Sequence, residues 1–153
     1  MSEYLDTSVI VKWFREEDEE RRKEALILRD RIINFDSEFV MSYYGLFELI
    51  RAMVKHNYPK ERIEEAFQSL NDLYEIDALK NVRLEEVLFL VKEIEIELKL
   101  YASDALHLAS AINHGCKIFW SEDQHHLKSK TKEYMQKFDV EVKSLKDVDL
   151  KKK

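Results

Sequence analysis

The sequence predicts an α/β fold in which helices cover a mostly parallel sheet. Short apolar runs alternate with long amphipathic segments, and this is the pattern of parallel strands joined by helices. The chain has 153 residues, of which 45% are hydrophobic, so it holds enough apolar material for the core of one compact domain. We expect that domain to span residues 1–148, followed by a basic tail at 149–153.

The individual elements are predicted from the spacing of apolar residues. Strands should lie near residues 4–5, 39–41, 75–77, 117–120 and 140–142. Helices, in which apolar residues recur three and four positions apart, should span about 9–14, 19–33, 43–56, 59–74, 84–98 and 104–114. Residues 43–74 should form a helical hairpin, because Pro59 suits the first turn of its second helix.

The helix expected at 43–56 contains an acidic residue, Glu48, among apolar neighbours. Phe47, Ile50 and Val54 form one apolar stripe on this helix. Glu48 lies on a different face, because residues share a helix face only at spacings of three and four. Glu48 should therefore not point into the main core.

The helix expected at 104–114 has a clear start and a clear end. Ser103 should cap its N-terminus, and Asp104 lies in the first turn, where the helix dipole favours an anion. Gly115 supplies a left-handed stop after the last turn. The small side chains of this helix should allow it to pack closely against the sheet.

Composition excludes several classes of protein. The single cysteine, Cys116, rules out a disulfide framework and a thiolate zinc cluster, and it favours a cytoplasmic location. The first residues reach Asp6 before any apolar stretch long enough for export, so no signal peptide is expected. Charged residues interrupt the longest apolar segment, 82–100, so no membrane span is expected either.

Four acidic residues stand at the edges of apolar or small-residue segments: Asp6, Glu48, Asp104 and Asp123. Each has an ordinary explanation, as a turn or cap residue for the aspartates or as a surface partner of Arg51 for Glu48. Capping does not explain Glu48 within its helix, nor two aspartates that directly follow separate strands. In a parallel sheet the carboxyl ends of strands meet at one edge, so the four residues should converge.

Such a cluster needs a cation, because buried carboxylates close together lose hydration and repel one another. Oxygen ligands without cysteines favour Mg²⁺ or Mn²⁺. We expect Asp6 and Asp104 to bind the ion directly, and Glu48 and Asp123 to bind it more loosely or through water. The hydroxyls of Thr7, Ser8 and Ser121 are candidates to orient these carboxylates.

Four segments resemble the PIN-domain nucleases, and especially the toxin ribonucleases of VapC type. The matching segments are Tyr4-Leu5-Asp6-Thr7-Ser8-Val9, Tyr44-Gly45-Leu46-Phe47-Glu48-Leu49-Ile50-Arg51-Ala52, Ser103-Asp104-Ala105-Leu106-His107-Leu108-Ala109-Ser110-Ala111 and Trp120-Ser121-Glu122-Asp123. The resemblance implies a three-layer α/β/α sandwich with the four acids as one site. It also implies Mg²⁺- or Mn²⁺-dependent cleavage of RNA, a cognate antitoxin and a homodimer.

Three positions near the last aspartate depart from the family pattern or are ambiguous. Ser121 stands where the family usually has threonine, which retains the hydroxyl. His126 stands where an aromatic residue is common, so either His126 or Leu127 should pack there. Glu122 makes the identity of the fourth acid ambiguous. Adjacent rings rarely face one ion, so His125 and His126 are expected in a loop or surface role, and His107 should bond locally.

The formal net charge of −6 opposes binding of a polyanion, but a divalent ion would reverse the local sign. Basic residues near the site in sequence could contact phosphates: Lys12, Arg15, Lys128, Lys130 and Lys132. Two alternatives stay open. One is a non-catalytic module that binds a protein through Tyr43, Tyr44 and Phe47, and the other is a haloacid-dehalogenase-type phosphatase, which requires a second acid where Ser8 stands.

Overall fold

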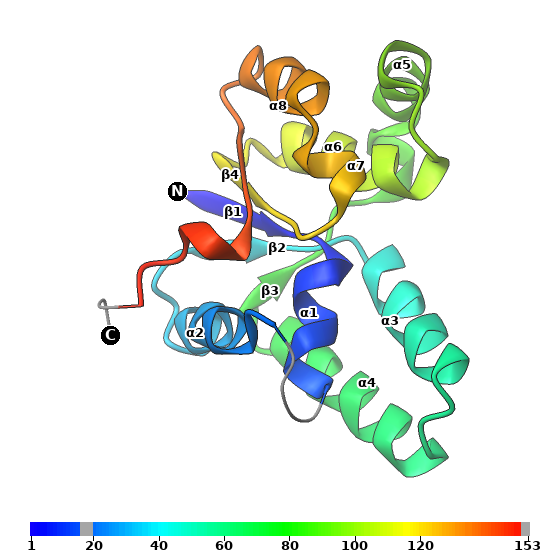
Figure 1. Ribbon diagram of the computed structural model, residues 1–153, viewed down its shortest axis with the longest axis vertical. Helices are drawn as coiled ribbons and strands as arrows, with labels where there is room; N and C mark the ends of the chain where they lie inside the picture. The colour runs from blue at the N-terminus through cyan, green and yellow to red at the C-terminus, as the bar shows by residue number, and fades with distance from the viewer. Residues whose placement is uncertain (16–19, 151–153) are drawn as a thin grey trace.

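The computed structural model describes residues 1–15 and 20–150, and within them it shows a five-stranded sheet between two layers of helices (Figure 1). The strands are β1 (Ser2–Leu5), β2 (Glu38–Val40), β3 (Leu79–Lys80), β4 (Ile118–Trp120) and β5 (Glu141–Lys143). Their order in the sheet is β3-β2-β1-β4-β5, and every neighbouring pair is parallel. The predicted α/β class with a parallel sheet is confirmed.

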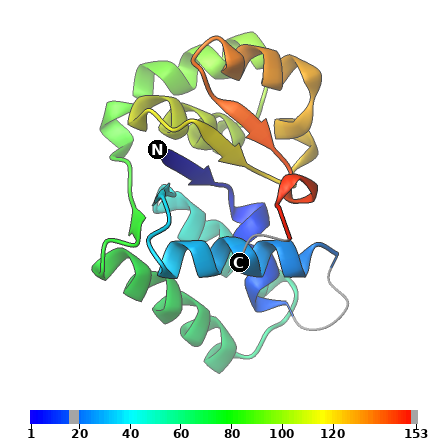
Figure 2. The ribbon, with the colours of Figure 1, turned by 90° about the vertical axis from the view of Figure 1, so that its left-hand side faces the viewer.

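Helices cover both faces of this sheet (Figures 1 and 2). One layer consists of α1 (Thr7–Phe14), α2 (Arg22–Ile33), α3 (Tyr44–Lys55) and α4 (Lys60–Glu75). The other consists of α5 (Leu88–Leu98), α6 (Ala102–His114) and α8 (Ser129–Gln136). The short helices η1 (Leu84–Glu86), α7 (Gln124–Leu127) and η2 (Leu145–Asp147) lie in the connections. The three-layer sandwich is therefore confirmed.

Alternation along the strands divides the core into two halves. Leu5, Phe39 and Trp120 belong to the cluster that packs on α1 to α4. Tyr4 and Phe119, their neighbours in the chain, belong to the cluster that packs on α5, α6 and α8. Successive strand residues point to opposite faces, so each strand supplies apolar side chains to both halves.

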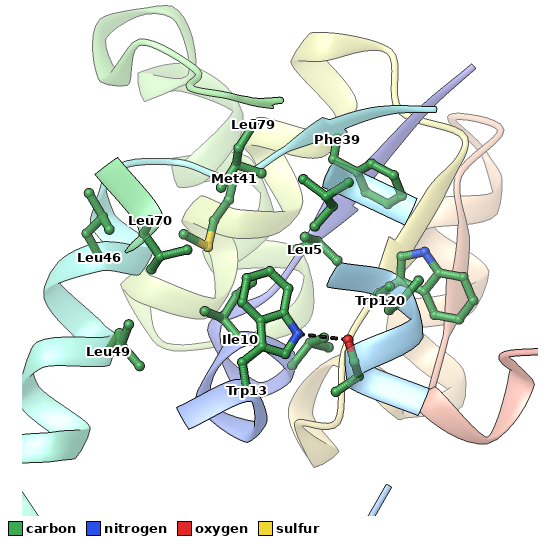
Figure 3. Packing of buried hydrophobic residues seen from close by; sticks show 14 of the residues in the cluster. Leu5, Ile10, Trp13, Phe39, Met41, Leu46, Leu49, Leu70, Leu79 and Trp120 are labelled. Atoms are coloured by element: carbon green, nitrogen blue, oxygen red, sulfur yellow. Dashed lines mark hydrogen bonds between the residues drawn. The ribbon is translucent and has the colours of Figure 1, made fainter. Parts of the chain in front are cut away.

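Packing between α1 and α2 is fixed by a buried polar contact. Trp13 of α1 is 4% exposed, and its indole N–H donates to the carbonyl oxygen of Ala25 at 2.8 Å (Figure 3). A buried indole requires such a partner. This contact holds the helix that begins directly after Asp6.

The chain runs from β1 outward through β2 to β3, and then returns to β4 on the other side of β1. The connection after β1 and the connection after β4 therefore lead to opposite sides of the sheet. Parallel α/β sheets bind ligands in the crevice at the carboxyl ends of two such strands. Asp6 follows β1 and Ser121 follows β4 at this point. The backbone N–H of Asp6 donates to the carbonyl oxygen of Trp120 at 3.0 Å, so the two strand ends are in register.

The strand predicted at 75–77 is wrong. α4 continues to Glu75, and Asp77 has a positive φ of 60°, which an extended strand does not allow. The strand instead lies at Leu79–Lys80. The apolar residue Ile76, which suggested a strand, is 55% exposed at the end of α4.

The helix predicted at 84–98 is interrupted, because η1 ends at Glu86 and α5 begins only at Leu88. Ser103 is not the N-cap of α6, which begins at Ala102 with Tyr101 in the capping position. Gly115 ends α6 in the left-handed conformation with φ 79°, as predicted. Asp104 lies in the first turn, also as predicted.

The predicted apolar stripe of α3 does not face the core, because none of Phe47, Ile50 and Val54 is buried. Leu46, Leu49 and Met53 are buried, whereas Phe47 is 61% exposed. Apolar residues occupy more than one face of this helix, so spacing alone does not identify the face that meets the core. Glu48 is half-buried and lies outside the main core, as predicted.

Within residues 1–15 and 20–150, no helix has both the length and the apolar composition that crossing a membrane requires. Residue 19, the predicted start of the second helix, lies outside the described residues, and α2 begins at Arg22. Lys151, Lys152 and Lys153 of the predicted basic tail also lie outside them.

Candidate functional site

Asp6 begins the site at the carboxyl end of β1. It is the N-cap of α1, and its Oδ2 accepts hydrogen bonds from the Ser8 backbone N–H at 3.1 Å and from the Ser8 hydroxyl at 2.7 Å. These bonds leave Oδ1 facing the rings of His107 and His126, at 3.8 Å from His107 Nε2 and 3.9 Å from His126 Nδ1. Asp6 is 5% exposed, so its position is set by the fold.

Asp123 comes from the loop after β4 and is held by backbone groups. Its backbone N–H donates to the Ser121 hydroxyl at 3.0 Å, and its Oδ1 accepts from the His125 backbone N–H at 2.8 Å. Ser121 is fully buried, and its hydroxyl also lies 3.4 Å from Asp6 Oδ2. Ser8 thus orients the carboxylate of Asp6, and the His125 backbone N–H orients that of Asp123, while Ser121 holds the Asp123 backbone.

Asp104 enters the site from the first turn of α6 and is 8% exposed. One ligand atom each from Asp104, Asp123 and His125 lie within 4.8 Å of one another. The same limit holds for Asp6, Asp123 and His126. Asp123 belongs to both groups, whereas Asp6 and Asp104, the two acids expected to bind one ion directly, share neither, so the three aspartates meet through Asp123.

Glu48 is the fourth predicted acid, and it belongs to neither of these groups. Its Oε1 accepts a hydrogen bond from the Thr7 hydroxyl at 2.8 Å, and His107 Nε2 donates to the same oxygen. Two donors thus engage Oε1, and no hydrogen bond from the described residues engages Oε2. Glu48 therefore lies beside the aspartates and connects to Asp6 through His107.

His107 is a functional residue that the sequence interpretation missed. It is fully buried, and its Nδ1 is hydrogen-bonded to the Tyr4 hydroxyl at 2.6 Å. Its partners Tyr4 and Glu48 are distant in the chain, so the expected local role is wrong. A polar ring three residues after Asp104, within a helix of small and apolar residues, was the available signal.

The electrostatics of the cluster are those of a cation site. Burial raises the pKa of Asp104, and the negative charges of Asp123 and Asp6 raise it further against the opposing effect of His126. Burial also acts to raise the pKa of Asp6, but His107, His126 and the bonds from Ser8 outweigh it and hold that pKa below its usual value. Burial lowers the pKa of His107, whereas the bond to Glu48 and the charge of Asp6 raise it, with a net increase.

His126 fills the place where the family pattern has an aromatic residue. Its ring is fully buried and stands edge-on to Phe119, with 4.9 Å between ring centroids. Its Nδ1 pairs with the Ser121 hydroxyl at 2.9 Å, and its Nε2 pairs with the Asp104 carbonyl oxygen at 3.2 Å. The expectation that His126 lies in a loop or on the surface is therefore wrong.

Glu122 points away from the acidic cluster. Its Oε2 accepts a hydrogen bond from the Leu145 backbone N–H at 2.9 Å and so connects the loop after β4 to η2. Asp123, and not Glu122, is the acid that the structure brings to Asp6 and Asp104.

Carboxylate oxygens from three buried or half-buried aspartates fit a hard divalent cation such as Mg²⁺ or Mn²⁺. Such an ion would offset the repulsion that raises the pKa of Asp104. Lys128, Lys130 and Lys132, which follow α7, are exposed and available to anions. Lys12 instead donates to the carbonyl oxygen of Glu20 at 2.7 Å.

Comparison with known proteins gives a consistent result. The chain resembles a chain of the FitAcB crystal structure from Neisseria gonorrhoeae, with TM-score 0.64 and 18% identity over 95% of this chain and 99% of that one. It also resembles a chain of VapBC2 from Rickettsia felis bound to a DNA fragment from their promoter, with TM-score 0.58 and 17% identity over 94% and 98% of the two chains. At this identity the likeness shows the fold.

No curated protein sequence matches the chain. The family model for the PIN domain matches residues 4–132, which include all four predicted acids. With that match over most of its length, the chain belongs to the PIN domain family.

Proposed function

We propose that the protein is a cytoplasmic, metal-dependent endoribonuclease and the toxin of a toxin–antitoxin pair. The observation that carries this proposal is the convergence of Asp6, Asp104 and Asp123 at the carboxyl edge of the sheet. Membership of the PIN domain family supports nuclease chemistry, and the segments that resemble VapC-type toxins support RNA as the substrate.

Asp6, Asp104 and Asp123 would hold a Mg²⁺ or Mn²⁺ ion, with Glu48 beside them through Oε2. When bound, the ion supplies Lewis acidity and positive charge for hydrolysis of a phosphodiester bond. Ser8 fixes the orientation of the Asp6 carboxylate, the His125 backbone N–H that of Asp123, and Thr7 and His107 that of Glu48. Each carboxylate thus keeps an oxygen for the ion without a reorganisation of the fold.

Exposed apolar side chains support the proposed protein partners. Tyr44 and Phe47 of α3 are 41% and 61% exposed and line a hollow of about 360 Å³ beside Glu48. The exposure of these aromatic residues suits an antitoxin that covers the site. Leu88 and Phe89 of α5 are also exposed, at 56% and 81%, and offer a surface for a homodimer.

The test is cleavage of a mixed RNA pool by the wild type, Asp6→Asn and Asp104→Asn in Mg²⁺, Mn²⁺ or EDTA. Both variants should lose more activity than the roughly 10- to 100-fold typical of an outer-sphere contact, and EDTA should abolish cleavage. Glu122→Gln is the matched control, because its amide oxygen can still accept from Leu145 and its side chain points away from the cluster. Cleavage that resists EDTA, or two aspartate variants as active as the control, would reject the proposal.

The phosphatase alternative lacks a structural basis, because the hydroxyl of Ser8 donates to Asp6 where that mechanism needs an acid. Release of phosphate from small phosphomonoesters, lost in Asp6→Asn, would revive it.

A further inference from the structure

The adjacent residues His125 and His126 both belong to groups that could hold an ion, but their rings are in different situations. Both nitrogens of His126 are hydrogen-bonded within the protein, Nδ1 to the Ser121 hydroxyl and Nε2 to the Asp104 carbonyl oxygen. An ion could bind this ring only if one of these buried contacts were lost. His126 is therefore a supporting residue and is unsuited to be a ligand.

The ring of His125 is half-buried and free to bind. No group in the described part of the chain hydrogen-bonds to either ring nitrogen. The hydrogen bond between His125 and Asp123 is made by the His125 backbone N–H and not by the ring. The ring stands edge-on to Tyr101, with 5.9 Å between centroids and 88° between planes. This contact restricts the ring at the mouth of the acidic cluster.

One nitrogen of this ring lies within 4.8 Å of a carboxylate oxygen of Asp104 and of one of Asp123. These two oxygens also lie within 4.8 Å of each other. Two ligands on opposite sides of an ion at about 2.1 Å lie about 4.2 Å apart, so small side-chain movements would bring all three to one ion. Imidazole suits transition ions, whereas Mg²⁺ is bound through carboxylates, phosphates and water.

We propose that His125 supplies a nitrogen ligand to the cation held by Asp104 and Asp123, so that the centre prefers Mn²⁺ to Mg²⁺. This inference rests on the cation of the proposed nuclease function and adds a ligand that the four acids do not include. In this proposal His125 binds the ion, whereas His126 supports the site through its hydrogen bonds to the Ser121 hydroxyl and the Asp104 carbonyl oxygen.

The experiment is pulsed electron paramagnetic resonance on the full chain loaded with Mn²⁺. The wild type should show the ¹⁴N coupling of a directly bound imidazole, and His125→Ala should lose it. His56→Ala is the control, because His56 lies exposed at the end of α3 and should leave the coupling unchanged. Isothermal titration should show at least about tenfold weaker Mn²⁺ binding in His125→Ala, with a smaller change for Mg²⁺.

Wild-type protein that binds Mn²⁺ without ¹⁴N coupling would overturn the inference, whether or not the variant folds. Coupling that persists in His125→Ala would also overturn it. If Mn²⁺ binds and RNA is cleaved in either of these cases, only the role of His125 fails. If the wild type binds no Mn²⁺, the cation of the proposed function fails as well.

Discussion

At the residue scale, Glu48 depends on two other side chains for its orientation. Thr7 and His107 both donate to Oε1, and Tyr4 holds the far side of the His107 ring. His107 is fully buried, so solvent water does not readily replace its hydrogen bond to Glu48. In the proposed function, His107 would be a positioning residue that acts on the cation through Glu48.

We expect His107→Leu to lower Mn²⁺ affinity about 10- to 100-fold, because Glu48 loses a donor that fixes it. His107→Gln should retain more affinity, since its amide N–H can still donate. Isothermal titration of both variants, with Glu48→Gln and the double variant, measures the coupling. If His107 acts through Glu48, the losses will not add; additive losses, or a His107→Leu variant that binds like the wild type, would contradict this role.

The convergence of three aspartates was predictable from sequence, because each directly follows a strand or begins a helix whose apolar pattern is clear. The role of His107 was not predictable in the same way. Its partners Tyr4 and Glu48 are 103 and 59 residues away in the chain, so their contact depends on how α6 and α3 pack. The half-exposed ring of His125 likewise acquires its position from Tyr101 and the turn of α7.

At the scale of elements, the end of α6 offers a clean test of local backbone chemistry. Gly115 has φ 79°, and a methyl group added there would meet no atom within 4 Å. Gly115→Ala should therefore lower the free energy of unfolding through backbone strain alone, by about 1–2 kcal/mol. Gly115→Asn should cost less, because asparagine tolerates this conformation.

Urea denaturation of the three proteins measures the difference. An alanine variant as stable as the wild type would show that α6 ends differently in solution. Loss of RNA cleavage is not expected, because Gly115 lies at the opposite end of α6 from Asp104.

Most element boundaries follow from sequence, and two of the errors share one cause. The strand expected at 75–77 and the buried stripe expected on α3 both involve apolar residues that the fold leaves exposed, Ile76 and Phe47. Periodicity shows which residues share a face, but only packing decides which face meets the core. The exposed residues on α3 lie beside the candidate site, where a partner would cover them.

At the scale of the whole molecule, an ion pair between buried Glu3 and half-buried Arg31 connects the neighbouring strands β1 and β4 to α2. Glu3 of β1 is fully buried and accepts from Arg31 at 2.6 and 3.1 Å and from the Trp120 indole at 2.8 Å. Burial acts to raise the pKa of Glu3, but the bonds from Arg31 and Trp120 hold that pKa below its usual value of 4.5. The stabilisation is thus present above pH 4.5 and is lost as the pH falls through the lowered pKa.

Arg31→Met should reduce the free energy of unfolding at neutral pH by about 3 kcal/mol, because a buried carboxylate loses its partner. The difference in the free energy of unfolding between the variant and the wild type should narrow as the pH falls below 4.5 and through the lowered pKa of Glu3. Arg83→Met is the control, since its ion pair with Glu85 is solvent-exposed and should contribute little to stability. A gap that is constant across this pH range would contradict the assignment.

Because the net charge is −6, the RNA of the proposed function would be attracted only by local positive charge near the site. Attraction depends on local positive charge, so the KM for RNA should rise between about 50 and 200 mM salt. Lys128→Gln combined with Lys130→Gln should raise KM and make it less sensitive to salt, because both lysines are exposed near the site. Cleavage kinetics at several salt concentrations test this, and rates that are indifferent to salt would oppose it.

The central claim of the proposed function is that Asp6 and Asp104, which belong to two groups that share Asp123, hold one divalent cation together with it. Anomalous diffraction from a crystal soaked in Mn²⁺ tests it most directly. We predict a manganese peak within bonding distance of carboxylate oxygens from these three residues, and its loss in Asp104→Asn. A map without a peak at this position, from protein that still cleaves RNA, would contradict the account.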